Sequence, residues 1–500
     1  MGIATLSPEL KLMIVEPLDF NSAFNFAITC KSHWSLCKRL MEIYAVLCIK
    51  YNTININGFG DDRVLWHTAK EVLDEPLRGE FIREINLTSC PSYWDVHVSW
   101  YPPAPFTGEI PPENYNESFH RATQIIAHNL SGNSQQSNLA SRLQDAMTRG
   151  ERDCPLVILT YNSPLLKTIR ATGLRSGNPF YRFLRRVAID YATPAMAPRL
   201  PFQHLTTVAL AHYDTEGGIS PDWCRYFICI PSLRAFVGSM VGGGCDRLSD
   251  DSEAYEPHVM VGGRGPEKCY DELEHDGDGE ERPRHRPILP MSNVEDLMFS
   301  HSALHFKKGV ENILSGITAL RRFYYDGSGQ GMVSDCNYSP KRVIKALVRH
   351  TGHSLEHLVM RSIFLYIEFQ GGFFAARRPD FKRISLRGFT KLKTLTCNWK
   401  MIYPMDLTPD EEKTFDLRDI LPASLEELQI FGNFSDDEWA AIQRVLVGKN
   451  DMTPNLRNVY IERRHGDNPN SLEVARSEGG QKISNEWTAT LFAKLTGHGW

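Results

Sequence analysis

The sequence contains no C-x-x-C pair, no long basic run and no apolar stretch long enough to cross a membrane. Its eleven cysteines are odd in number and scattered, which favours reduced thiols over a disulfide framework. With no secretory signal pattern at the N-terminus, we expect a protein of the cytoplasm or the nucleus. The net charge of −5 and the lack of basic runs argue against a nucleic-acid partner, and we expect no membrane partner.

The composition is that of a globular protein, with 42% hydrophobic and 23% charged residues. Five hundred residues suffice for one large core, or for a small domain followed by a long array of repeats. The order of motifs along the chain favours the second arrangement.

Residues 6–40 predict three short helices separated by turns. Ser7 can cap the first helix, and Pro17 ends it. The third helix is expected to begin near Ser32 and to continue to about Tyr51. So short a segment cannot bury all of its apolar surface alone, so we expect it to contact a partner.

One set of positions is spread over these three helices: Leu6, Pro8, Glu9, Leu10, Ile14, Leu18, Phe24, Cys30 and Trp34. Their spacing in residues 1–50 resembles an F-box, the module that docks substrate adaptors onto the Skp subunit of Skp–cullin–F-box ubiquitin ligases. The family usually has Pro directly after the first Leu, whereas here Ser7 intervenes. The resemblance implies that the set binds the Skp adaptor. The alternative is a helical hairpin that packs on its own domain.

Further along the chain, three apolar residues recur at positions i, i+3 and i+5, which predicts a series of strands. The instances are 82–87, 166–171, 184–189, 205–210, 233–238, 294–299, 320–325, 355–360, 392–397, 425–430 and 456–461. Capped helices are expected between several of them, for example after Ser220 and at the capping box Ser435–Glu438. A motif that returns about every 18 to 35 residues is typical of a solenoid.

This alternation resembles the irregular leucine-rich repeats that follow the F-box in many fungal F-box proteins. It implies an α/β fold, in which a three-helix F-box precedes a solenoid of parallel strands with helices on the convex side. The expected domains are the F-box at 1–50, a connecting region with a Pro-rich loop at 51–135, and the solenoid at 136–500. An ordinary α/β domain is the alternative.

Three segments interrupt or close the expected array. Residues 242–292 are rich in Gly, Asp and Glu and predict a disordered acidic insertion. Residues 90–117 are rich in Pro and aromatic residues and predict an irregular loop. Residues 485–495 predict a short helix that caps the last repeat.

The residues between the apolar positions of each strand are expected on the opposite face of the sheet. On three later strands they are Arg322, Tyr324, Asp326, His357, Arg361, Glu427 and Phe431, accompanied by Val359 and Gln429. Side-by-side strands would bring them into one ribbon that contains residue types enriched at binding hot spots. We predict that the ribbon binds a protein target. The alternative is a solvated strand face.

Features that could carry chemistry do not have the required spacing. The glycine-rich segment 327–331 lacks the Lys-Ser/Thr pair of a phosphate-binding loop. Cys245, His258, Cys269 and His275 do not have zinc-finger spacing. We therefore expect no catalytic residue, no metal and no cofactor.

The sequence thus predicts a non-catalytic recognition subunit that binds the Skp adaptor and an unknown protein substrate. One alternative is a leucine-rich-repeat interaction scaffold outside any ubiquitin ligase, in which the N-terminal helices only cap the solenoid. Another is an enzyme with an unrecognised site in residues 90–135 or 242–292.

Overall fold

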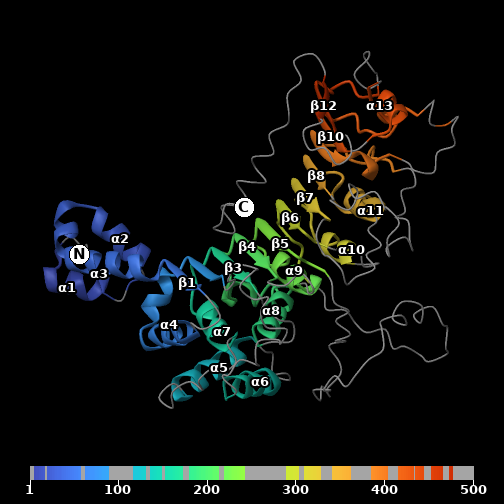
Figure 1. Cartoon of the computed structure of the whole chain (residues 1–500). Coiled ribbons are helices and arrows are strands. Elements are labelled where there is room, and N and C mark those ends of the chain that lie inside the picture. Colours follow the sequence, from blue (N-terminus) through green and yellow to red (C-terminus); the bar gives the residue numbers. More distant parts are fainter. Residues whose placement is uncertain are drawn as a thin grey trace, which may run out of the picture.

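The structure is a computed structural model of the 500-residue chain (Figure 1). It describes residues 5–16, 18, 20–57, 62–88, 116–130, 136–148, 153–172, 179–212, 219–242, 289–302, 309–327, 340–361, 384–403, 411, 415–432, 434–443, 452–464 and 472–476.

Three helices form the N-terminal part, as the sequence predicts: α1 (Pro8–Val15), α2 (Phe20–Ile28) and α3 (Lys31–Tyr51). The Ser7 hydroxyl caps α1 by accepting a hydrogen bond from the Leu10 amide at 3.5 Å. Ala23, Cys37 and Tyr44 are fully buried between the helices and the rest of the chain.

One open sheet of twelve strands follows, and its strands lie side by side in chain order. Neighbouring strands from β1 to β11 are parallel, and β12 is antiparallel to β11. The strands are β1 (Thr53–Asn57), β2 (Glu84–Thr88), β3 (Thr168–Thr172), β4 (Thr207–Ala211), β5 (Ala235–Ser239), β6 (Asp296–Ser300), β7 (Arg322–Asp326), β8 (His357–Arg361), β9 (Thr394–Asn398), β10 (Glu427–Gly432), β11 (Asn458–Arg464) and β12 (Leu472–Arg476). The α/β class is confirmed, and the arrangement is compatible with a solenoid-like fold.

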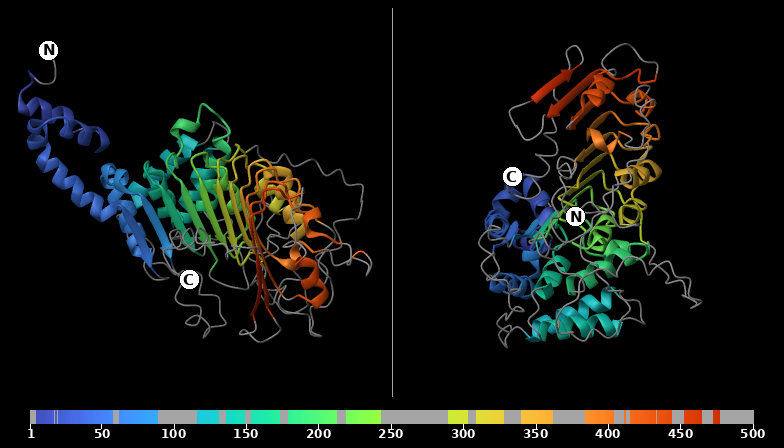
Figure 2. Two further views of the ribbon diagram at one scale, coloured as in Figure 1. Left: turned by 90° about the horizontal axis from the view of Figure 1, so that it is seen from above. Right: turned by 45° about the vertical axis from the view of Figure 1, so that its right-hand side comes forward.

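Helices between the strands pack on one face of the sheet (Figures 1 and 2). They are α4 (Asp62–Asp74), α5 (Asn116–Leu130), α6 (Gln136–Thr148), α7 (Asp153–Tyr161), α8 (Pro179–Asp190), α9 (Pro221–Ile228), α10 (Gly309–Leu314), α11 (Pro340–Thr351) and α13 (Asp436–Gln443). Short 3-10 helices are η2 (Pro76–Phe81), η4 (Ala197–Arg199), η6 (Trp399–Met401) and η7 (Leu417–Asp419). Ser220 caps α9, and Ser435 with Glu438 forms the expected capping box of α13.

The main core lies between the sheet and these helices and is continuous from Val15 in α1 to Ile461 in β11. A second, smaller apolar cluster lies on the opposite face of the sheet, which carries none of the described helices and which we call the helix-free face. Its members come from five successive strands: Ala209, Val237, Met298, Tyr324 and Val359. Alternation along each strand therefore separates two chemically distinct faces.

Every expected strand is present except 184–189, which lies inside α8. Phe180, Phe183, Leu184 and Val187 are all buried and follow the spacing i, i+3, i+4 and i+7. This helical periodicity overrides the i, i+3, i+5 pattern, which fits a helix as well as a strand. The prediction of a strand at 184–189 is therefore wrong.

The sheet begins earlier than the expected solenoid boundary at 136. Thr53–Asn57 forms β1, although its asparagines made the region from Asn55 onward resemble a turn. Ile54 and Ile56 are buried while the intervening Asn55 is exposed, which is the alternation of a strand with one buried face. Both β1 and β2 thus lie within the expected connecting region 51–135.

Three predictions concern residues outside those that the structure describes. They are most of the acidic insertion, at 243–288, most of the Pro-rich loop, at 90–115, and the C-terminal helix at 485–495.

Candidate functional site

The first candidate surface is formed by six apolar side chains that α1, α2 and the first turn of α3 leave exposed. Their exposed fractions run from 39% for Phe24 to 68% for Met13. We call this set the N-terminal apolar residues: Leu10, Met13, Ile14, Phe24, Ile28 and Trp34. Large hydrophobic side chains grouped on three adjoining helices are typical of a protein-binding surface.

The expected adaptor-binding residues lie within this part of the chain but differ in accessibility. Leu6 and Leu18 are half-buried, and all the others are exposed: Pro8, Glu9, Leu10, Ile14, Phe24, Cys30 and Trp34. Hydrogen bonds from its own backbone amide and from Ser7 lower the pKa of Glu9. Met13 and Ile28 are also exposed, but they were not among the expected adaptor-binding residues. Met13 follows Leu10 by three residues and Ile28 follows Phe24 by four, so helical spacing places each of them beside an expected residue.

The N-terminal helices are attached to the first repeat by an aromatic cluster. Phe20 of α2, Tyr44 of α3 and Phe81 of η2 have ring centroids 5.3 to 5.6 Å apart. Such edge-on and tilted contacts are the preferred geometries of aromatic pairs. The three helices therefore close the β1 end of the sheet, and they project beyond it (Figures 1 and 2).

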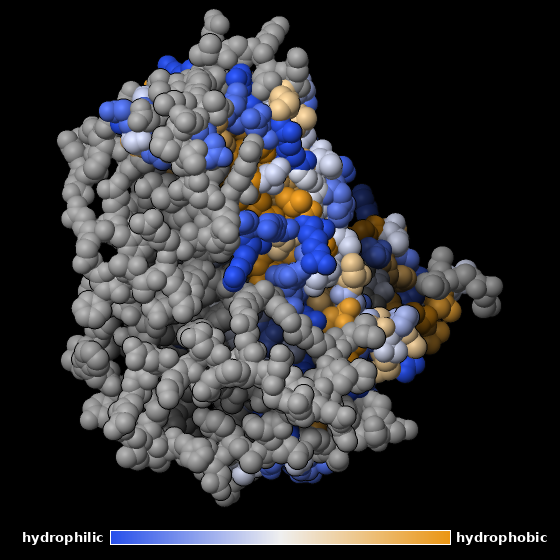
Figure 3. All heavy atoms as spheres, turned by 90° about the vertical axis from the view of Figure 1, so that its right-hand side faces the viewer, coloured by the Kyte–Doolittle hydropathy of each residue, from blue (hydrophilic) through white to orange (hydrophobic). Residues whose placement is uncertain are grey.

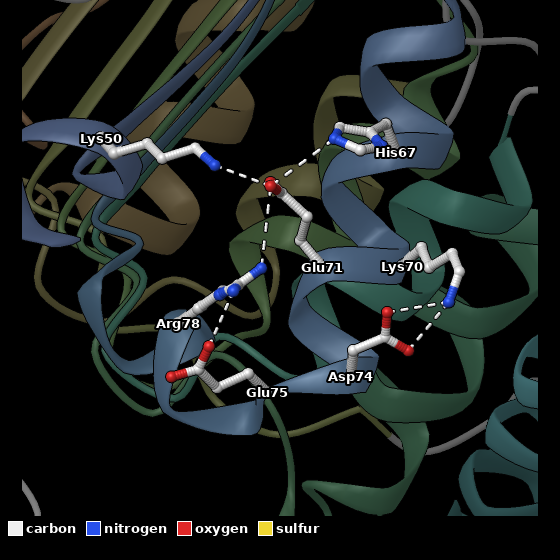
Figure 4. A network of polar contacts seen from close by, with 7 residues as sticks. All are labelled: Lys50, His67, Lys70, Glu71, Asp74, Glu75 and Arg78. Carbon is white, nitrogen blue, oxygen red and sulfur yellow. Dashed lines mark hydrogen bonds and ion pairs between the residues drawn. The ribbon is translucent and has the colours of Figure 1, made fainter.

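Charged residues reinforce the same junction around Glu71 of α4 (Figure 4). The Glu71 carboxylate lies 2.7 Å from Lys50 Nζ of α3 and 3.7 Å from an Arg78 Nη1 of η2. Burial is the largest single influence and raises the pKa of Glu71, but the hydrogen bond and charge of Lys50, together with Tyr51 and His67, outweigh it and lower the pKa. Since α3 ends at Tyr51 and β1 begins at Thr53, the junction has almost no linker.

The second candidate surface is the helix-free face of β7, β8 and β10, where the expected target-binding residues lie. The strand register places Arg322 beside His357 and Asp326 beside Arg361, and β9 joins β8 to β10. The guanidinium of Arg361 reaches over β9 to stack on the Phe431 ring, at 5.8 Å from its centroid. The expected ribbon therefore exists as one row of neighbouring strands.

The members of the ribbon are not equally accessible. Tyr324 and Phe431 are each only 7% exposed, and burial raises the pKa of Tyr324 to about 12. Arg322 forms an ion pair with Asp296 of β6, and a His357 ring nitrogen lies 2.8 Å from the Thr394 hydroxyl. The half-buried members are Arg322, Asp326, His357, Arg361 and Glu427.

Gln429 of β10 accompanies the expected target-binding residues on the ribbon. Its side chain is buried, and its Oε1 atom accepts no hydrogen bond. A buried acceptor without a donor is costly, because it has lost its hydrogen bonds to water. The sequence signal for Gln429 is its position in the strand, because alternation places it on the same face as Glu427 and Phe431.

Charged and apolar residues adjoin one another on the described surface seen from the right-hand side of Figure 1 (Figure 3). Among the described residues, no three His, Cys, Asp or Glu side chains are grouped as metal ligands. None of the described helices is long and apolar enough to cross a membrane.

Comparison with known proteins assigns no family. No family model matches the sequence, and no curated protein matches it. The function therefore has to be argued from the two surfaces.

Proposed function

We propose that this chain is the substrate-recognition adaptor of a Skp–cullin–F-box ubiquitin ligase. The observation that carries the proposal is the exposure of the N-terminal apolar residues on three helices whose spacing resembles an F-box. A helical cap alone would bury its apolar side chains against the rest of the chain, as Tyr44 does against Phe81 of η2. Among the described residues nothing covers the exposed set, and it suits the Skp adaptor.

In this proposal the helix-free face of β7–β10 holds the protein target. The half-buried Arg322, His357 and Arg361 supply the polar contacts that orient a partner. The adaptor would then raise the concentration of the target at another subunit's active site, and no residue of this chain would take part in the chemistry. Such a subunit would act in the cytoplasm or the nucleus.

The rival function is a repeat scaffold outside any ubiquitin ligase. The aromatic junction of Phe20, Tyr44 and Phe81 fits this rival equally well, because it shows the helices packed on the first repeat. The two functions differ in one outcome, which is binding to the Skp adaptor.

We predict that Leu10→Ala with Ile14→Ala abolishes binding of the full chain to the purified Skp adaptor. Each truncated hot-spot side chain should cost about 2 kcal/mol or more of binding free energy. Because both side chains are about half exposed, the melting temperature should stay near that of the parent. Binding is measured by calorimetry and melting by circular dichroism.

The matched control is Ile125→Ala on α5, which removes a similarly exposed apolar side chain far along the chain. It should bind the adaptor like the parent. If the parent itself does not bind, the ligase function is wrong and the scaffold remains. If the double variant binds as tightly as the parent, the docking residues are elsewhere.

A further inference from the structure

A second apolar stripe runs along the solvent side of α3. Ile43, Val46 and Ile49 are 47%, 64% and 86% exposed, and Ile49 is the most exposed large hydrophobic side chain among the described residues. The three follow one another at spacings of three residues on a helix of 21 residues. This stripe is absent from the proposed adaptor contacts.

The centre of the stripe lies on a different side of α3 from Trp34, whereas Ile49 is rotated only about 60° from Trp34 but lies about 22 Å further along the helix axis. At about 100° per residue, Val46 is rotated roughly 120° around the helix from Trp34. Val46 is also the centre of a second row, because Glu42 and Lys50 lie four residues before and after it. Both charged side chains are mainly exposed.

The order of apolar and charged residues around Val46 matches that of a second α3 helix that runs in the opposite direction. If two copies of α3 pair antiparallel with Val46 at the centre, Ile43 of each copy faces Ile49 of the other. Glu42 then faces Lys50 of the other copy, which keeps its pair with Glu71 of its own chain and is still 55% exposed, so that opposite charges flank the apolar contact on both sides. In such a pair, the row of residues spaced by three on one helix lies in the groove between rows of residues spaced by four on the other helix. The two helix axes then cross at a shallow angle.

We propose that the chain forms a homodimer through α3, with a two-fold axis passing near Val46. A second copy is the occupant that this surface fits, because a two-fold interface requires one patch to be complementary to itself. Trp34 stays accessible on the other side of the helix. The dimer is therefore independent of the proposed adaptor binding.

The contact is small, since three apolar residues from each copy form its centre. Small interfaces of this kind are weak, and we expect dissociation in the micromolar range, on the order of 10 μM. The molar mass of the full chain should therefore rise with concentration. Sedimentation velocity across low to high micromolar concentrations measures it.

The first test compares Val46→Glu with Ile125→Glu, which places the same charge at an exposed position on α5. Val46→Glu should remain monomeric at every concentration, whereas Ile125→Glu should dimerise like the parent. Neither change removes a buried side chain, and circular dichroism verifies that both variants are folded. A monomeric parent, or a dimer unaffected by Val46→Glu, overturns the proposal.

The second test uses disulfide cross-linking to determine which residues of the two α3 helices face each other. In a parent carrying Cys30→Ser and Cys48→Ser, Val46→Cys should form a disulfide-linked dimer under mild oxidation. Lys38→Cys is equally accessible on the same helix, but its two copies would lie about 24 Å apart along the axis. It should not link.

Equal cross-linking of the two variants would mean random collision and would overturn the two-fold pairing. A parent that stays monomeric but cosediments with phosphatidylcholine–phosphatidylserine vesicles would also overturn it, in favour of a membrane surface as the occupant of the stripe.

Discussion

At the scale of single residues, Glu356 ties together the starts of three strands. It precedes β8 directly, and its carboxylate accepts hydrogen bonds from Lys393 at 2.8 Å and from Arg321 at 2.9 Å. These two cations precede β9 and β7. Their hydrogen bonds, that of Lys393 first, lower the pKa of Glu356 from 4.5 to about 2. The carboxylate therefore stabilises the register of neighbouring strands.

We predict that Glu356→Gln lowers the melting temperature at neutral pH, because glutamine keeps the shape but loses both ion pairs. The folded-state pKa lies below the unfolded value, so this stabilisation is complete above about pH 4.5 and disappears as the pH falls towards about 2. Since Lys393 and Arg321 are about half exposed, the loss should be about 1 kcal/mol or less.

Melting curves of the parent and of Glu356→Gln at a series of pH values test this. Glu426→Gln, which removes a carboxylate one residue before β10, is the control. A difference between parent and Glu356→Gln that does not shrink in acid would contradict the assignment.

At the scale of elements, α13 depends on its capping box. The Ser435 amide donates to the Glu438 carboxylate at 2.8 Å, and the Glu438 amide donates to the Ser435 hydroxyl at 3.2 Å. Glu438 also accepts a hydrogen bond from the Trp399 indole at 3.3 Å. The cap therefore connects α13 to η6, which follows the neighbouring strand β9.

We predict that Ser435→Ala destabilises α13 by about 1 kcal/mol, because an amide at the helix start loses its acceptor. Ser435→Thr keeps the hydroxyl and should restore most of the loss. Hydrogen exchange of the α13 amides measures both variants. Equal exchange in the parent and in Ser435→Ala would show that the cap contributes nothing.

A helix or a strand could be predicted from the sequence where the apolar spacing and a neighbouring start or stop signal agreed. It could not be predicted where the same apolar spacing fits both a helix and a strand. The strands of the later repeats combine the i, i+3, i+5 spacing with a preceding helix end. In α8 the same spacing arose within a helix, and only Phe180 and Phe183 reveal the 3.6-residue period. In β1 the asparagines concealed a strand, because alternation over five residues is a weak signal beside turn-forming residues.

At the scale of the whole molecule, strand order determines which residues meet. Alternation alone predicted that Arg322, His357 and Glu427 share one face, and the register bears this out. The side chains with which these residues form ion pairs and hydrogen bonds could not be predicted from the sequence. The ion pair between Arg322 and Asp296 requires the pairing of β6 with β7, and the Glu71 junction joins three elements that the sequence does not relate to one another.

We predict that His357→Ala with Glu427→Ala reduces target capture while adaptor binding stays unchanged. Both side chains are half-buried on the helix-free face, and removing them deprives a target of polar contacts there. Quantitative mass spectrometry of copurifying proteins, with ubiquitin turnover blocked, measures the effect. Tyr324 is unsuitable for this test, because removing its buried ring would destabilise the sheet.

The control is Lys345→Ala on α11, an exposed residue on the helical side of the sheet. An unchanged set of captured proteins in the double variant would move the target site away from the helix-free face. Equal losses in both variants would indicate a general effect on the fold.

The pairing of each strand with its neighbours in sequence also governs how the chain can fold. Contacts between adjacent repeats are short-range in sequence, so folding can spread from one repeat to the next without first closing a large loop. The steps from β2 to β3 and from β5 to β6 are exceptions, since residues 89–167 and 240–295 separate the paired strands. Loop-closure entropy grows only with the logarithm of length, so these crossings slow assembly modestly and tolerate further insertion. The chain can thus lengthen at these two points over evolution while the register of the strands is preserved.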